Sequence, residues 1–260
     1  MLTALVTGGN RGIGRAAVQQ LAQLGYKVWL GARDPDKGRA AEMDLRADGL
    51  DVSWLPLDVA DDTSVRAAAR TVSEAGPSLD VLVNNAAISL DRNPGDNGSW
   101  RPSELPLENL RRTFDVNYFG AIAVTQAFLP LLRRSPAGRI VNVSSGLGSF
   151  AYNTDPKADF GPALNILAYK TSKAALNLAT VLFAYELRDT PIKVNAASPS
   201  ARIPGPVATD LSGPGRGEEL ARQGFGPPEE GARTIIQLAT LPADGPSGEF
   251  HDIELGVFPW

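Results

Sequence analysis

Residues 2–14 read LTALVTGGNRGIG, and this stretch decides the fold. The apolar run 2–6 predicts a buried strand, and Gly8, Gly12 and Gly14 follow it where the chain has to turn tightly into a helix. The free amide groups and the positive dipole end of that helix face the turn, which makes the turn a suitable site for a phosphate. In the order strand, turn, helix, the glycines predict a dinucleotide site; a purely structural turn is the alternative.

Short apolar runs alternate with longer stretches of helical period along the rest of the chain. Strands separated by helices favour parallel pairing through right-handed crossovers. We therefore predict an α/β fold, a single-domain Rossmann-like doubly wound parallel sheet flanked by helices, over residues 1–260. The predicted strands are Thr3–Thr7, Lys27–Gly31, Val52–Leu57, Val81–Asn84, Arg139–Ser144 and Lys193–Ser198.

The stretch from about Leu164 to Arg188 predicts a long helix with an apolar face too broad to be left in water. Its small residues, such as Ala174 and Ala175, would allow close packing. We favour packing of this face against the sheet; packing against another subunit is the alternative, which leaves a homo-oligomer open.

Three segments broken by proline or glycine predict loops that follow strands: residues 89–106, 146–163 and 199–228. In an open α/β sheet, ligands bind beyond the carboxyl ends of the strands. These loops are therefore expected to surround a substrate, and a structural role for any one of them is the alternative.

Composition excludes several classes of function. The chain has no cysteine and one histidine, His251, so disulfides, thiolate catalysis and a cysteine or histidine metal cluster are excluded, and we expect no metal. A net charge of -4 provides no overall basic field for nucleic acid or an anionic membrane. The apolar runs fall short of the roughly 20 residues that span a bilayer, and a signal-type start is absent, so we expect a cytoplasmic protein.

Two arginines predict which dinucleotide binds. Arg33 follows the second predicted strand, where an acidic residue would otherwise bond the ribose hydroxyls, and an arginine there suits a 2′-phosphate. Arg11, inside the glycine turn, could add a second positive charge. NADP(H) is therefore favoured over NAD(H), although either arginine could be a solvated surface residue and Asp34 could offset the charge of Arg33.

Polar residues also end the next two predicted strands. Asp58 could accept a hydrogen bond from the adenine amino group, or it could cap a nearby helix. Asn84 and Asn85 could tie neighbouring strands together or bind the cofactor.

Tyr169 and Lys173 lie four residues apart in AYKTSKAALN and predict a site of proton transfer. Positions i and i+4 share one face of a helix, and a phenol with an ordinary pKa of about 10 needs a nearby cation to favour its ionised form. We expect Lys173 to lower the pKa of Tyr169. Together with a dinucleotide site, the pair predicts a redox enzyme.

In this order the motifs resemble the short-chain dehydrogenase/reductase family over nearly the whole chain. The residues that carry the resemblance are the spaced glycines, Asp58, Asn84-Asn85-Ala86, Asn117, Ser145, Tyr169 and Lys173. Four further features are similar to the carbonyl-reductase branch: Gly31-Ala32-Arg33-Asp34, Val141-Asn142-Val143-Ser144-Ser145, the long gap before Tyr169, and Glu229-Glu230-Gly231-Ala232 near the C-terminus.

The resemblance implies an NADPH-dependent carbonyl reductase that acts on a ketone or aldehyde and is reversible to alcohol oxidation. Tyr169 would exchange the proton with the substrate oxygen, and Lys173 would bind the nicotinamide ribose. Ser145 would bond the substrate oxygen, with Ser144 as a competitor for that role. Asn117 would shape its helix and hold a water that connects Lys173 to solvent.

The resemblance also implies a set of cofactor-binding residues. They are Gly8, Asn10, Arg11, Gly12, Ile13, Gly14, Arg33, Asp58, Val59, Asn85, Ala86, Tyr169, Lys173, Val207 and Thr209. The sequence departs from the family pattern at two places, because Ala87 replaces the last glycine of Asn-Asn-Ala-Gly and Pro199-Ser200 replaces Pro-Gly. The register of Val207 and Thr209 is open for that reason.

Other functions compete with carbonyl reduction. Reduction of an activated double bond would use the same family, and a noncatalytic dinucleotide sensor would use the same fold. Phe150, Tyr152 and Phe160, before Tyr169, could wall a substrate pocket or cover a surface. The C-terminal residues 257–260 are expected to pack back onto the fold.

Overall fold

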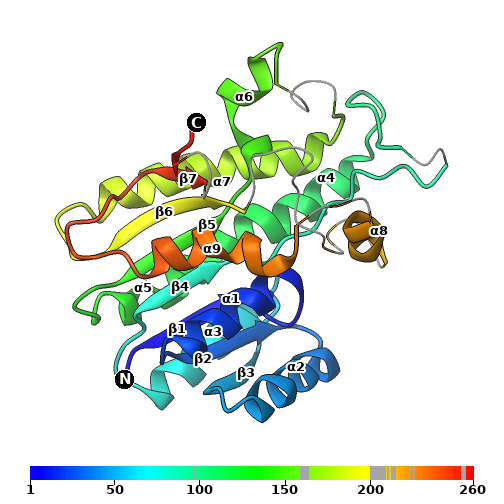
Figure 1. Ribbon diagram of the computed structural model, residues 1–260. Helices are drawn as coiled ribbons and strands as arrows, with labels where there is room; N and C mark the ends of the chain where they lie inside the picture. Colours follow the sequence, from blue (N-terminus) through cyan, green and yellow to red (C-terminus); the bar gives the residue numbers. More distant parts are fainter. Residues whose placement is uncertain are drawn as a thin grey trace.

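A computed structural model describes residues 1–95, 98–158, 164–199, 209, 211, 215–222, 224, 226–252 and 256–260. Within these residues the chain forms one eight-stranded sheet with the order β3-β2-β1-β4-β5-β6-β7-β8. All neighbouring strands pair in parallel except β7 and β8, which are antiparallel. The predicted single-domain Rossmann-like sheet is therefore confirmed, and Figure 1 shows it between its flanking helices.

The strands are β1 (Thr3–Thr7), β2 (Lys27–Ala32), β3 (Val52–Pro56), β4 (Val81–Asn84), β5 (Arg139–Val143), β6 (Lys193–Ser198), β7 (Phe250–Asp252) and β8 (Gly256–Val257). The α-helices are α1 (Gly12–Gln23), α2 (Pro35–Ala47), α3 (Asp62–Ala75), α4 (Leu107–Phe114), α5 (Gly120–Leu132), α6 (Phe150–Thr154), α7 (Leu167–Glu186), α8 (Arg216–Arg222) and α9 (Pro228–Ala239). A π-helical turn, η1 (Asp115–Phe119), joins α4 to α5, and a 3-10 turn, η2 (Gly146–Gly148), precedes α6. The six predicted strands are confirmed to within one residue at each end, whereas β7 and β8 were missed.

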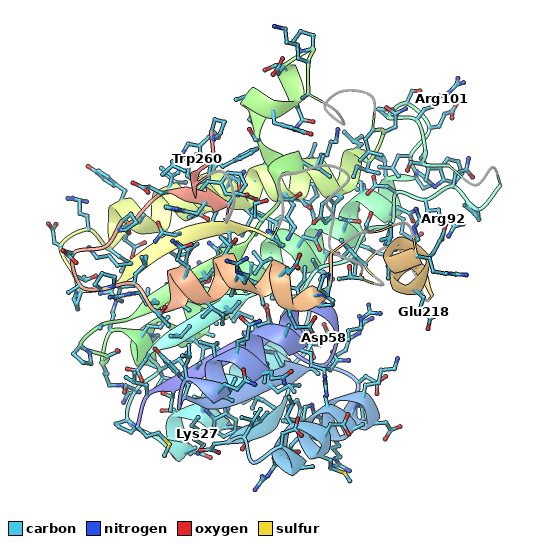
Figure 2. All side chains as sticks on the ribbon, viewed as in Figure 1. Lys27, Asp58, Arg92, Arg101, Glu218 and Trp260 are labelled. Carbon is cyan, nitrogen blue, oxygen red and sulfur yellow. The ribbon has the colours of Figure 1, made fainter. Side chains whose placement is uncertain are left out.

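The C-terminal residues pack against the edge of the sheet, as expected from the sequence. The ring of Phe258 lies 5.2 Å from that of Phe250 on β7, and Trp260 stacks on Phe250 at 5.5 Å. Figure 2 labels Trp260 at the end of the chain. The amide of Ala151 on α6 donates to the carbonyl oxygen of Trp260 at 3.0 Å. The end of the chain therefore supports the segment that precedes Tyr169.

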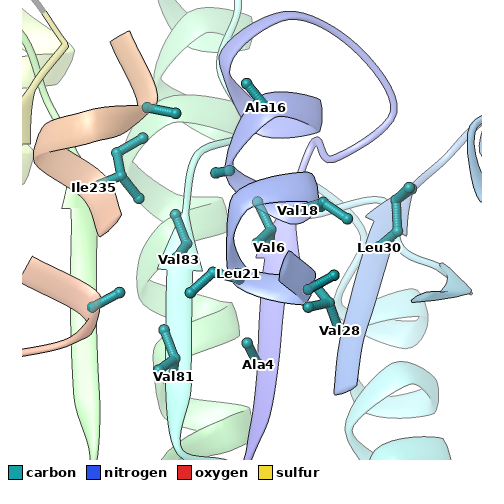
Figure 3. Packing of buried hydrophobic residues seen from close by; sticks show 14 of the residues in the cluster. Ala4, Val6, Ala16, Val18, Leu21, Val28, Leu30, Val81, Val83 and Ile235 are labelled. Carbon is teal, nitrogen blue, oxygen red and sulfur yellow. The ribbon is translucent and has the colours of Figure 1, made fainter. Parts of the chain in front are cut away.

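Two apolar layers enclose the sheet. Along β1, Ala4 and Val6 face the layer formed by α1, α2 and α9, whereas Leu5 faces the layer formed by α3, α5 and α7. Figure 3 shows the first layer, in which Leu21 of α1 and Ile235 of α9 lie over the strands. Because both faces are covered, the strands are mostly apolar, which explains why they could be recognised as continuous runs.

The strand order defines where a ligand would bind. β1 pairs with β2 on one side and with β4 on the other, so the chain reverses its direction of winding between β1 and β4. Such a switch point opens a crevice beyond the carboxyl ends of the two strands. The glycine turn after β1 and the asparagines that end β4 lie on either side of it.

The apolar face of α7 divides between the core and the surface. Ala168, Leu176 and Ala179 are buried, but Leu178 and Leu182 are each 61% exposed. The prediction that the broad face packs on the sheet is therefore wrong for these two leucines, because they lie on the side of the helix that points away from the strands. Of the helices among the described residues, none combines the length and apolarity needed to cross a bilayer.

Candidate active site

The turn between β1 and α1 needs glycine for two physical reasons. Gly8 and Gly12 have φ angles of 65° and 54°, in the left-handed region that other residues rarely adopt. A side chain at Gly14 would collide with the carbonyl group of Gly8 and the side-chain amide of Asn85. Arg11, at the N-cap of α1, makes no side-chain hydrogen bond to the first turn. The turn therefore fits a phosphate group.

Asn85 holds this turn in place. Its side-chain amide donates to the carbonyl oxygens of Thr7 at 2.8 Å and Gly8 at 3.2 Å. The Thr7 hydroxyl in turn accepts from the backbone amides of Asn85 and Ala86 at 2.9 and 3.0 Å. The side-chain amide of Asn84 donates to Thr125 and Asn142, both at 2.9 Å, and so ties β4 to α5 and β5. Both asparagine side chains thus make the structural contacts that the sequence left as one of two alternatives.

Arg33 and Arg11 are both exposed at the edge of this turn. Asp34 does not form an ion pair with Arg33; its carboxylate caps α2 by accepting from the amides of Asp36 and Lys37, each at 3.1 Å, and pairs with the Lys37 ammonium at 3.2 Å. The amide and the ammonium group of Lys37 hold the pKa of Asp34 below its usual value. Arg33 makes no ion pair with any described residue, which leaves its guanidinium available to an anion.

The remaining predicted cofactor residues lie along the same edge. Asp58 accepts from the amide of Ala60 at 3.1 Å, and Asp61, not Asp58, caps α3 by accepting from Thr63 at 2.9 Å. Val59 is buried, and a side chain at Gly120 of α5 would collide with it.

The other residues of the set flank the glycine turn. Asn10 is partly buried in the turn, and Ile13 packs against the core from α1. Thr209 lies beside the turn, because a Cβ atom built on Gly12 would come within 3.3 Å of the Thr209 methyl group. Val207 lies outside the described residues.

Ser145, Tyr169 and Lys173 come together beyond the carboxyl end of β5. Tyr169 is in the first turn of α7, and its side chain hydrogen-bonds the hydroxyl of Ser145. The Lys173 ammonium lies 5.6 Å from the centre of the Tyr169 ring and donates to the carbonyl oxygen of Val143 at 2.7 Å. The hydroxyl of Ser144 instead donates to Asn177 on α7. Of the two neighbouring serines, Ser145 is thus the one that meets Tyr169.

Burial shifts the pKa values of Tyr169 and Lys173 in opposite directions. It raises the pKa of Tyr169 to about 12, against the opposing effect of the Ser145 hydrogen bond, and it lowers the pKa of Lys173 to about 7. The expectation that Lys173 lowers the pKa of Tyr169 is therefore wrong for the protein alone. Removal of water disfavours both charged forms, and the Lys173 ammonium bonds a backbone carbonyl instead of the phenol oxygen.

Asn117 lies in the π-helical turn η1 and is only 1% exposed. Its side chain accepts from the amide of Ile88 at 2.8 Å, and it donates to the Ile88 carbonyl at 2.9 Å and to the Ser172 hydroxyl at 3.0 Å. It therefore joins the segment after β4 to α7. These contacts support a role in shaping the helix, while a bound water stays a prediction.

Sequence reasoning missed Asp91, in the segment after β4. Its side chain is 1% exposed, and its carboxylate accepts from the backbone amides of Ala168 at 2.8 Å and Tyr169 at 3.1 Å. One signal could have revealed a partner, because Ile166, immediately before α7, is a poor residue for capping a helix.

The loop after β4 and the segment that contains α8 lie close to each other beside the site. Glu219 of α8 pairs with Arg216, and this bond together with the charges of Arg92 and Arg222 holds the pKa of Glu219 below its usual value. Figure 2 shows Arg92, from the loop after β4, next to α8. Two of the predicted substrate loops are therefore neighbours.

A cavity of about 260 Å³ lies along the other side of α7. Thr171 and Ala174 line it, and on a helix they point roughly opposite to Tyr169. Phe150 also lines this cavity, whereas Tyr152 packs near Phe258 at a ring distance of 6.2 Å. Its walls include none of Ser145, Tyr169 and Lys173. Phe160 lies outside the described residues.

Comparison with known proteins gives a consistent result. The model of the short chain dehydrogenase family matches residues 2–219. The short-chain dehydrogenase anuI of Penicillium roqueforti is 36% identical over 241 residues, covering 91% of this chain and 87% of the relative. The NADPH carbonyl reductase 1 of Sus scrofa is 33% identical over 302 residues, covering 99% and 96%. The crystal structure of NADPH-bound carbonyl reductase from chicken fatty liver gives a TM-score of 0.81 at 29% identity, covering 99% and 98%.

A Rossmann fold with serine, tyrosine and lysine grouped beyond its strands defines a class of oxidoreductases. Within that class, the chain belongs to the short-chain dehydrogenase family. It is therefore an oxidoreductase of a family that uses nicotinamide dinucleotides.

Proposed function

We propose that this protein is an NADPH-dependent carbonyl reductase, which reduces a ketone or an aldehyde and can run in reverse. The observation that carries the proposal is the contact of Tyr169 with Ser145, with Lys173 buried beside the ring. The relatives named as NADPH carbonyl reductases support the same substrate class and cofactor.

The residues at the switch point fit NADPH. The pyrophosphate would lie at the start of α1, where Gly8, Gly12 and Gly14 let the backbone approach closely. The 2′-phosphate would meet Arg33, with Arg11 as a second cation, and the adenine would meet Asp58. The chain would hold the nicotinamide end beside Thr209 and Lys173.

Bound NADPH would supply the hydride to the carbonyl carbon. Tyr169 would donate its phenolic proton to the carbonyl oxygen, which yields the alcohol and leaves Tyr169 as a phenolate. Ser145 would donate a hydrogen bond to the same oxygen, and the Lys173 ammonium would stabilise the phenolate until a proton returns from solvent. With a pKa raised to about 12, Tyr169 holds its proton at neutral pH, which suits the reductive direction.

The test measures turnover with NADPH or NADH and a broad panel of aldehydes and ketones. Turnover is monitored as the decrease in the absorbance of the reduced nicotinamide. Tyr169→Phe should lower kcat by about 10² to 10⁴, the usual contribution of a general acid. Tyr185→Phe is the matched control, because Tyr185 lies on the same helix and is 67% exposed. Consumption that survives Tyr169→Phe, or tight NADPH binding without turnover on the whole panel, would contradict the proposal.

A further inference from the structure

The start of α7 depends on a residue from another part of the chain. The first amides of a helix have no partner within it, and a side chain just before the helix usually accepts from them. Ile166 occupies that position in α7 and has no side-chain acceptor. Asp91, 77 residues away from Ala168, supplies both carboxylate oxygens instead, one to Ala168 and one to Tyr169.

Because Asp91 is buried, its carboxylate needs hydrogen bonds from the protein in place of those from water. Its side chain is 1% exposed and forms no ion pair with a described residue, so its hydrogen bonds have to replace the lost water. Besides the two amides of α7, Ser89 donates to it at 3.2 Å. Burial raises the pKa of Asp91, and the hydrogen bonds from the two amides oppose that effect. The positive end of the α7 dipole also favours a carboxylate at this place.

The contact reaches the proposed proton donor directly. The backbone amide of Tyr169 is bonded to Asp91 and its side chain is bonded to Ser145, so the residue is held from two sides. The backbone carbonyl of Asp91 accepts from the amide of Trp100 at 2.8 Å, which joins the two sides of the loop that carries Asp91. The position of Tyr169 is thus coupled to the loop after β4.

We propose that Asp91 is a positioning residue that fixes the first turn of α7 and so orients the phenol of Tyr169 for proton transfer. This inference rests on the proposed reductase function. Asp91 bonds the backbone amide of Tyr169 and not its phenol, so it acts by positioning that residue.

The first test compares Asp91→Asn and Asp91→Ser with the wild-type enzyme. Asparagine keeps one acceptor but places an amino group against a backbone amide, and serine keeps a single small acceptor. We expect kcat per NADPH-binding site to fall about 10- to 100-fold, while the KM for NADPH changes less than about twofold. The isotope effect with deuterated NADPH should rise as the chemical step becomes slower.

Asp61→Asn is the matched control, because Asp61 also caps a helix, α3, by accepting from the amide of Thr63. Because asparagine is also a good N-cap, it should leave kcat per binding site and the isotope effect unchanged. If Asp91 only stabilised the fold, its variants would behave like Asp61→Asn.

A double-mutant cycle then separates positioning from other effects. In a Tyr169→Phe background, Asp91→Asn should lower the residual rate by less than about twofold, since its effect is transmitted through the phenol. A full additional 10- to 100-fold loss in that background would overturn the proposal.

A measurement without turnover keeps the two proposals distinguishable. If the wild type is inactive on the whole panel, the reductase function fails, and Asp91 is tested by the tyrosinate absorbance of the protein minus that of Tyr169→Phe. In the wild type, Tyr169 should stay mostly protonated up to about pH 11, because its pKa is raised to about 12. In Asp91→Asn it should ionise nearer its ordinary pKa of about 10. Identical titrations would show that Asp91 does not hold the phenol in place.

Discussion

Tyr169 and Lys173 lie on one face of α7, and burial favours the neutral form of each. The pKa values of about 12 and about 7 mean that Tyr169 carries its proton at neutral pH while Lys173 is close to its midpoint. The resting site is therefore prepared to give a proton rather than to accept one. Any stabilisation of the phenolate has to arise when substrate and cofactor are bound.

This state predicts a pH dependence that differs between the two directions. Alcohol oxidation needs the Tyr169 phenolate, whose fraction rises about tenfold per pH unit below the pKa, so kcat/KM for oxidation should increase steadily with alkalinity. Carbonyl reduction needs the protonated phenol and should show no such increase. Rate profiles in both directions check this; an oxidation rate that is flat between about pH 7 and 9 would show that Tyr169 is already ionised in the complex.

Arg33 permits a prediction about the cofactor, because its guanidinium is exposed and free of any described carboxylate. Arg33→Ala should raise the KM for NADPH by about 10- to 100-fold, the value of a lost charge-assisted hydrogen bond, and leave the KM for NADH nearly unchanged. Arg46→Ala, which removes an exposed arginine of α2, is the control. Equal changes for both cofactors would mean that Arg33 does not meet the 2′-phosphate.

At the level of elements, the predictability of the fold follows from burial. The six predicted strands, β1 to β6, contribute buried residues to the apolar layers on the two faces of the sheet, so their sequences are largely apolar runs that stand out between helices. The two strands that were missed, β7 and β8, have three and two residues, too few to show a pattern. The helix α7 was recognised, but the division of its apolar face depends on which side the sheet covers.

The site was less predictable than the fold, because the direction in which a side chain points and the extent of its burial depend on tertiary packing. The spacing of Tyr169 and Lys173 places them on one helix face, and the structure shows the two side chains together. Which of Ser144 and Ser145 meets Tyr169 depends on how α7 packs against the end of β5. The pKa shifts depend on the loss of water around both groups, and Asp91 contacts α7 from a distant part of the chain.

The close packing of the turn between β1 and α1 predicts the effect of a side chain at Gly14. Gly14→Ala should destabilise the fold by about 1–3 kcal/mol, because the new methyl group meets the backbone of Gly8 and the fixed amide of Asn85. NADPH binding should weaken with it, since the helix start has to move away from the turn.

Gly76→Ala is the control for this change, because a Cβ atom there meets nothing within 4 Å. Thermal unfolding and NADPH titration of both variants provide the measurement. A Gly14→Ala protein with unchanged stability and affinity would show that the close approach of α1 to the turn is dispensable.

Across the whole molecule, one short segment after β4 joins the parts of the site. Asn85 holds the turn at Gly8, Ile88 binds Asn117 of η1, and Asp91 holds the start of α7. These three contacts connect the β1 turn, the middle of the chain and the helix of Tyr169. The switch point between β1 and β4 is therefore fixed on both sides by residues 85–91.

This arrangement sets a boundary for engineering the substrate range. A new loop grafted after β4 can vary in length only where it does not alter the spacing from Asn85 to Asp91, because that spacing fixes the cofactor turn relative to the proton donor. Grafts that begin beyond Asp91 keep this spacing. A single residue inserted near Ile88 would instead shift Asp91 relative to Asn85. The variable part of the loop thus begins at Arg92, at the rim next to α8.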